Sequence, residues 1–292
     1  MTITQRQNPA PALRVKQEPG HPRDSRAAAR RVRQRTAVRR SLRGAIGLLV
    51  VVAVWQLVSV LGLVHPSQLP SATAAFGELS QQVTDLEFWR NVGRTMSTWA
   101  VGLAIASVAG IVLGTVIGLV PFLRRATHTV IEFLRPIPSV ALIPIAVLTY
   151  GIQPQAALVV VIYASLWQVL VQVLYGVADI DAVGRDTARS FRLPLRTRLG
   201  RVILPTAMPY LVTGLRLAAA VALILAITAE MTIGNPGLGR QLTMAAGVGD
   251  QPLVYAIVIV TGILGLIINL VFRAIEKRAL HWHQSIRGEE VL

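Results

Sequence analysis

Six long apolar runs limit what this chain can fold into. Each has about 18 residues or more, enough for a helix to cross a hydrocarbon layer roughly 30 Å thick. The runs lack the alternation of barrel strands, so we expect helices, which satisfy every backbone group within one segment in lipid. The sequence therefore predicts an all-α, polytopic membrane protein with six transmembrane helices. The predicted spans are Ala45–Val64, Thr98–Val120, Val130–Tyr150, Ala156–Leu174, Leu211–Ile233 and Val254–Phe272.

Positive charge is concentrated in every second connecting segment. The net charge of +15 would suggest a nucleic-acid partner in a soluble protein, but 12 of the 29 Lys and Arg lie within residues 1–43. The segment between the fourth and fifth spans, the one between the second and third, and the C-terminal tail are also basic. Basic flanks of spans stay in the cytoplasm. We therefore expect both termini in the cytoplasm and no nucleic-acid partner.

The chain divides into one membrane domain and two tails. Residues 1–43 are rich in Pro, Gln and Arg and poor in large apolar side chains, a composition typical of disorder. This cytoplasmic tail fixes topology or contacts anionic lipid headgroups. The membrane domain is expected over residues 44–283, with a second cytoplasmic tail at 284–292, which leaves no room for a soluble catalytic domain. The chain has no cysteine, which excludes disulfides and thiolate chemistry.

Small residues and prolines within the spans indicate close packing and a break. Gly110, Gly114 and Gly118 fall on one helical face, where another helix can approach closely. Pro136, Pro138 and Pro144 each remove a backbone donor and kink or break the third span.

Irregular backbone at this depth is tolerated where it faces protein or a watery cavity. Pro136, Pro138 and the adjacent Ser139 are therefore candidates for a translocation path, with a purely structural kink as the alternative.

Few ionisable residues lie near the spans. Glu230, near the outer end of the fifth span, is a candidate for the path, as a gate or in an ion pair, or else a plain interfacial carboxylate. Arg135 and Arg216 are placed near inner span ends, close enough to snorkel to the interface. The five histidines are scattered without neighbouring acids. We therefore expect no catalytic residues, metal site or bound cofactor.

The loop between the fourth and fifth spans has apolar residues at helical spacing on both sides of Pro194. A proline ends a helix at the residue before it, so we expect two short amphipathic helices joined by a turn within residues 179–209. Pro205 and Pro209 then lead into the fifth span. The two stripes are Ile180, Val183, Gly184, Thr187, Ala188 and Phe191, followed by Leu195, Leu199, Val202 and Ile203.

This loop resembles the coupling loop of ABC importer permeases. Their motif reads Glu-Ala-Ala, three residues, Gly, nine residues, Ile, one residue, Leu-Pro. Thr187 and Arg192 depart from it, and loss of the glycine leaves Pro194 to set the turn. The corresponding residues here are Asp186, Thr187, Ala188, Arg192, Val202, Leu204 and Pro205.

The resemblance extends over roughly residues 45–283. The segments "FLRPIPSVALIPIAVLTYG", "LPTAMPYLVTGLRLA" and "AEMTIGNPGLGRQL" are similar to the nitrate, sulfonate, taurine and bicarbonate branch of these permeases. It implies the MetI-like fold of type I importers, a multi-pass bacterial inner-membrane location, and a path for a small solute, such as one of these anions. The implied ATPase-coupling residues are Asp186, Thr187, Ala188, Arg189, Phe191, Arg192, Leu204 and Pro205.

The implied partners are two cytosolic ABC ATPases, a second permease subunit and an extracytoplasmic binding protein. The second subunit is a copy of this chain or a different permease. No G-x-x-x-x-G-K-[ST] phosphate loop is present, so ATP would be bound by the partner and this chain would not be an enzyme. An ATP-independent secondary carrier, which would need mid-membrane coupling charges or an inverted repeat, and a non-transporting scaffold are the alternatives.

Overall fold

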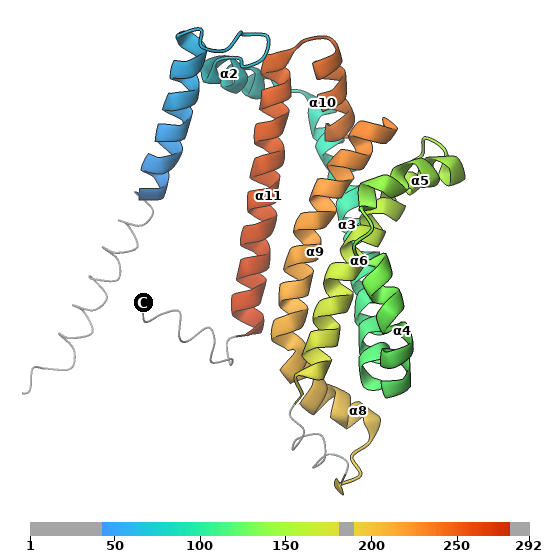
Figure 1. Ribbon diagram of the computed structural model, residues 1–292. Helices are drawn as coiled ribbons and strands as arrows, with labels where there is room; N and C mark the ends of the chain where they lie inside the picture. Colours follow the sequence, from blue (N-terminus) through green and yellow to red (C-terminus); the bar gives the residue numbers. More distant parts are fainter. Residues whose placement is uncertain (1–42, 181–189, 281–292) are drawn as a thin grey trace, which may run out of the picture. The chain divides into compact units, whose positions relative to one another are not determined.

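The computed structural model describes residues 43–180 and 190–280 and is helical throughout, with no strand in those ranges (Figure 1). It forms two units, divided between Val58 and Ser59, and each is described by itself. The first contains most of a helix, Arg43–Val60, that is long and apolar enough to cross a membrane. Everything below concerns the second unit.

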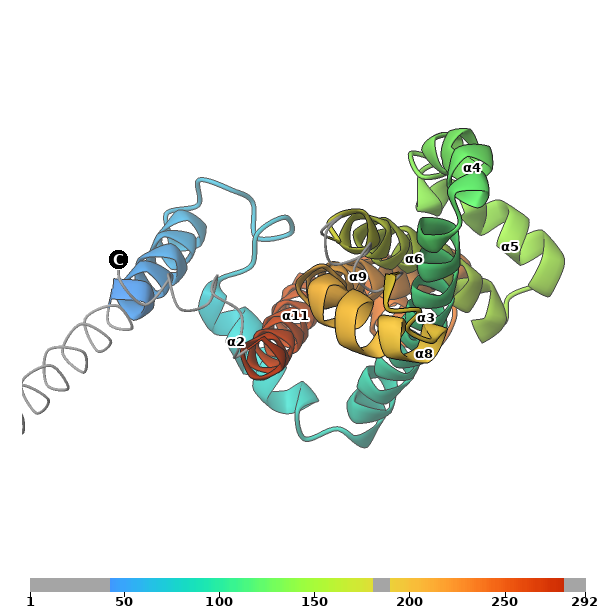
Figure 2. The ribbon, with the colours of Figure 1, turned by 90° about the horizontal axis from the view of Figure 1, so that it is seen from below.

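The core of the second unit is formed by three long helices, α3 (Leu86–Leu119), α6 (Pro154–Ala178) and α9 (Leu204–Ile233). The side chains between them are mainly valine and alanine, which allow the helix axes to lie close together. α6 is the most buried of the candidate spans, and α11 (Gln251–Ala279) packs against α9. In the view from the end at which α8 lies, α6 and α9 lie between α11 and α4 (Figure 2).

The predicted glycine face of α3 is confirmed as a packing surface. A Cβ added at Gly110, Gly114 or Gly118 would lie only 2.8, 2.9 or 2.9 Å from a valine of α6. Each glycine faces the valine 59 positions further along, so the two helices run in the same direction in constant register. The facing pairs are Gly102 with Val161, Gly110 with Val169, Gly114 with Val173, and Gly118 with Val177.

The predicted third span, Val130–Tyr150, is broken, as its prolines predicted. α4 (Pro121–Leu134) is followed by a turn, a 3₁₀ helix at Ser139–Leu142 and α5 (Ile143–Tyr150), and the two parts are bent by 86°. Pro136 and Pro138 lie in the break because neither can donate a backbone hydrogen bond. The prediction of one span at 130–150 was too short, since the helix begins at Pro121.

Two short helices that the sequence analysis missed lie near one end of the long helices. They are α2 (Ala72–Gln82) and α10 (Leu238–Gly247), and both pack against α11 (Figure 1). Ser71 caps the first turn of α2, as Asp85 caps α3 and Asp250 caps α11. Their polar composition, far from a membrane span, had been assigned to plain loops.

At the opposite end, which we call the α8 end, the chain enters α9 through two short helical pieces. α8 (Leu195–Arg198) continues into a π-helical turn (Leu199–Ile203) and then into α9. The predicted second amphipathic helix is thus present, but it runs on into the fifth span without a break. Most of the predicted first helix lies outside the described residues.

The described residues contain five helices able to span a membrane, or six if the bent pair is one span. The all-α fold is as predicted. α3, α9 and α11 exceed the predicted spans, because polar turns extend each helix past its apolar stretch. The proposed domain limits at residues 43 and 283 remain predictions, since both tails lie outside the described residues.

Candidate coupling region and translocation path

Four of the eight predicted coupling residues lie in the described part of the chain. Phe191 follows the masked half of the loop and is 75% exposed, and Leu204 at the start of α9 is half exposed. Pro205 occupies the first turn of α9, where its missing N–H costs no helical hydrogen bond. The structure places these apolar side chains at the α8 end, away from the buried core. The other four, Asp186, Thr187, Ala188 and Arg189, lie outside the described residues.

Arg192 adopts the backbone conformation that the family motif reserves for glycine. Its φ is +48°, and no other non-glycine residue of the described chain has a positive φ. The left-handed region places Cβ close to a neighbouring carbonyl, at a cost of roughly 1–2 kcal/mol. The turn is therefore made without the glycine, and Pro194 follows it directly before α8.

An apolar crevice lies beside the start of α9. Its volume is about 370 Å³, and it is formed between α3, α6 and the π-helical turn. Leu204, a predicted coupling residue, is part of its wall. The other lining residues are Ile111, Thr115, Val173, Val177, Gly200, Ile203, Ala207 and Leu211.

The predicted path residues Pro136, Pro138 and Ser139 lie together at the break between α4 and α5. Both prolines are exposed and Ser139 is half-buried. The hydroxyl of Tyr163 donates a hydrogen bond of 2.6 Å to the carbonyl of Leu134, just before the break. Tyr163 lies well inside α6, so the irregular backbone of the break lies beside the middle of a spanning helix.

Glu230 is a buried hydrogen-bond acceptor and not an interfacial carboxylate. It is 2% exposed, and no basic side chain of the described residues pairs with it. Its Oε2 accepts hydrogen bonds from the hydroxyl of Thr95, at 2.8 Å, and from the N–H of Gly239, at 3.0 Å. The Thr95 hydroxyl in turn accepts from the N–H of Leu238 at 2.9 Å. The carboxylate therefore ties α9, α3 and the start of α10 together.

Two glycines in the segment "GNPGLG" make this contact possible. A Cβ at Gly237 would lie 2.4 Å from Oε2 of Glu230, and one at Gly239 would lie 2.3 Å from the carbonyl of Ile227. No larger residue fits at either position without moving the backbone. Sequence analysis identified Glu230 but missed Thr95 and Gly239, because hydrogen bonds between distant segments leave no local pattern.

Arg216 forms an ion pair that the sequence analysis missed. Its guanidinium lies 2.9 Å from the carboxylate of Glu276, which joins α9 to α11. The predicted need to snorkel is removed by this partner. Arg216 also borders a groove of about 400 Å³ between α9 and α11.

Comparison with known proteins decides the family. The model for the binding-protein-dependent transport system inner membrane component matches residues 106–281, which is more than half of the chain. The chain belongs to this family. It is an ABC importer permease, as the loop and the broken third span had predicted.

The permease is similar to several curated relatives. It is 28% identical to the taurine transport system permease protein TauC of Escherichia coli (strain K12), over 89% of this chain and 96% of the relative. It is 28% identical to the nitrate import permease protein NrtB of Leptolyngbya laminosa, over 66% and 69%, respectively. For the putative aliphatic sulfonates transport permease protein SsuC of Bacillus subtilis (strain 168), the identity is 22% over 82% and 87%.

Solved structures support the fold of the permease. A chain of the inward-facing MetNI methionine ABC transporter matches with a TM-score of 0.59 at 19% identity, covering 66% of this chain and 96% of that one. A chain of an amino acid ABC transporter matches with a TM-score of 0.53 at 16% identity, over 65% and 91%. These likenesses confirm the predicted MetI-like fold.

Proposed function

We propose that this permease forms the path for a small anion in an ATP-driven importer, with its α8 end in the cytoplasm and gripped by an ABC ATPase. The relatives named for taurine, nitrate and aliphatic sulfonates support the substrate class. The observation that carries the coupling role is the exposed Phe191 beside the Arg192 turn at the α8 end. An aromatic side chain that no described residue buries is suited to a partner's pocket.

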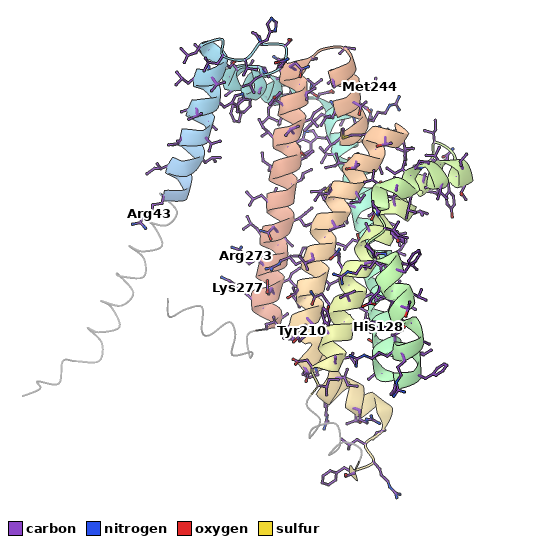
Figure 3. All side chains as sticks on the ribbon, viewed as in Figure 1. Arg43, His128, Tyr210, Met244, Arg273 and Lys277 are labelled. Atoms are coloured by element: carbon purple, nitrogen blue, oxygen red, sulfur yellow. The ribbon has the colours of Figure 1, made fainter. Side chains whose placement is uncertain are left out.

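Charge supports the proposed orientation. The α8 end carries Arg192, Arg198 and Arg201, and the same end of α11 carries Arg273 and Lys277 (Figure 3). Basic residues that flank spans favour the cytoplasm. Both tails are basic as well, so both termini would lie on that side.

The division of labour follows from family and sequence. ATP would be bound by two cytosolic ATPase subunits, because this chain lacks a phosphate-binding loop. An extracytoplasmic binding protein would deliver the anion, and a second permease would complete the path. Closure of the ATPase pair shifts the permease only if its two states differ in affinity for that closed pair. The coupling residues, Asp186 to Arg189 included, transmit that difference.

The test is binding of the partner ATPase to the purified permease in nanodiscs. We expect Phe191→Ala to weaken binding about tenfold or more, as truncation of a buried interface aromatic does. The matched control is Phe122→Ala, because Phe122 is also 75% exposed but lies on α4. Equal binding by both variants would contradict the coupling role of Phe191, and uptake without ATP would favour a secondary carrier.

A further inference from the structure

α4 presents three distinct faces, of which one packs and one is apolar. At about 100° per residue, the half-buried Leu123, Thr127, Ile131 and Leu134 share the face turned to the bundle. A second face carries Phe122, Val130 and Phe133, which are 75%, 53% and 72% exposed. Large exposed apolar side chains on a helix of a membrane protein are suited to lipid. α4 therefore has one packed face and one lipid-compatible face.

The third face of α4 carries all of its charge. Five ionisable side chains fall within an arc of about 100°, with no large apolar residue among them, and all five are exposed. His128 and Glu132 lie 3.4 Å apart, whereas the three arginines have no ion-pair partner in the described part of the chain. We call this set the charged face. Its members are Arg124, Arg125, His128, Glu132 and Arg135.

The charged face extends far into the bundle, which corrects the prediction that Arg135 snorkels from an inner span end. Arg135 follows Leu134, whose carbonyl accepts the hydrogen bond of Tyr163. Tyr163 is the tenth of the 25 residues of α6, so about 14 Å of that helix lie on one side of it and about 22 Å on the other at 1.5 Å per residue. Arg135 thus lies beside the middle of a spanning helix. His128 lies in the half of the bundle nearer to α8 (Figure 3).

A guanidinium at that depth needs water or a counter-charge, because hydrocarbon solvates neither. The packed and apolar faces of α4 are turned away from it, so lipid can cover α4 without touching Arg135. The break after Arg135 opens the backbone at the same level, and Pro136 and Pro138 are exposed there. Irregular backbone and free charge at one depth are both tolerated beside a water-filled cavity.

We propose that the charged face of α4 is a wall of the aqueous path, and that Arg135 is the deepest of its anion-binding groups. This proposal rests on the transport function proposed above and names its ligand chemistry: a small oxyanion, such as a sulfonate, nitrate or carboxylate. The planar guanidinium offers paired donors that match two oxygens of such a group. With three arginines against one glutamate, the face attracts anions along its whole length.

The natural absence of cysteine makes the wall directly testable. Single cysteines at His128, Glu132 and Arg135 are compared with controls at Val130 and Phe133 in the assembled importer in nanodiscs, using charged methanethiosulfonate reagents. We expect modification at the first three positions and at least tenfold slower modification at the two controls, because charged reagents do not enter lipid. Uniformly slow modification would show that protein covers the face, and would overturn the proposal.

Charge selectivity is tested on the Glu132→Cys background. Residues three apart on a helix have Cβ atoms about 5–6 Å from each other, so a cation at 135 acts strongly on a reagent at 132. We expect Arg135→Gln to lower the ratio of anionic to cationic reagent rates about three- to tenfold. Arg273→Gln, on α11, is the matched control and should leave the ratio unchanged. An unchanged ratio with Arg135→Gln would overturn its role as an anion-binding group.

A last arm separates a transported anion from the headgroup of an anionic lipid. Bimane is attached to cysteine at Phe122 or Phe133, and nitroxide lipids report its depth in the bilayer. The two positions are about 16 Å apart along α4 at 1.5 Å per residue. We expect the label at 133 to lie clearly deeper. Equal, shallow depths would place α4 flat on the surface, where its arginines meet headgroups, and would overturn the wall.

The proposed function is monitored separately on the same samples. ATPase binding at the α8 end does not involve the charged face, so it should persist in each variant. Failure of the accessibility pattern with ATPase binding intact overturns the wall alone. Failure of the wild-type permease to bind the ATPase overturns the function on which the wall rests.

Discussion

Replacement of Gly114 by alanine tests the packing on which the bundle depends. The added Cβ would lie 2.9 Å from both Cβ and Cγ1 of Val173 and 3.1 Å from the carbonyl oxygen of Leu170. Favourable carbon contacts need about 3.5–4.0 Å, so α3 and α6 must separate by roughly half an ångström or more. Such overpacking typically costs about 1–3 kcal/mol.

Gly93→Ala is the matched control for this substitution. Gly93 also lies within α3, but a Cβ there meets no atom within 4 Å. Both substitutions gain about 1 kcal/mol of helix propensity, so the difference between them isolates the overpacking cost. We expect the free energy of unfolding of Gly114→Ala to lie about 1–3 kcal/mol below that of Gly93→Ala, measured by steric trapping in detergent.

A double-mutant cycle sharpens the same test. The three atoms nearest to a Cβ at Gly118 all belong to Val177. Val177→Ala removes two of them, so Gly118→Ala should cost less in that background than in the wild type. Equal stability of Gly114→Ala and Gly93→Ala, together with a strictly additive cycle, would refute the close approach of α3 and α6.

Three further substitutions probe the site. Thr95→Val removes the donor to Glu230 and the acceptor of a buried N–H, so we expect about 2–4 kcal/mol lower stability by chemical unfolding; Thr95→Ser should retain most of it. Arg192→Gly relieves the positive φ, so the amides of α8 should exchange hydrogen about two- to fivefold more slowly, whereas Arg192→Ala should give no such gain. The half-exposed Arg216–Glu276 pair should show a coupling free energy of about 0.5–1 kcal/mol in a double-mutant cycle; a value of zero would mean that the two charges do not interact.

Hydrophobic runs and punctuation residues in the sequence predict much of this fold. The apolar runs locate the spanning helices, because lipid leaves few alternatives for the backbone. The in-register glycines identify the face of α3 that meets α6, and the prolines locate the break after α4. Each of these features acts through bonds or contacts that a short stretch of sequence specifies.

The features that were missed depend on contacts between distant segments. Thr95 and Gly239 approach Glu230 only in the folded chain, and Arg216 meets Glu276 from 60 positions away. Arg135 was placed near a span end because the apolar window began at Val130, whereas the helix starts at Pro121. An amphipathic helix next to a span has too little hydrophobicity to register as membrane-embedded, although its charged face is its most informative part.

ATP-dependent uptake tests the central proposal most directly. The permease is reconstituted in liposomes with its ATPase and binding protein, and accumulation of radiolabelled anion is followed with and without ATP inside the preparation's ATPase compartment. We expect uptake only with ATP and the binding protein, and its loss in Phe191→Ala but not in Phe122→Ala. Accumulation that continues without ATP, or that is unaffected by Phe191→Ala, would contradict coupling through the α8 end.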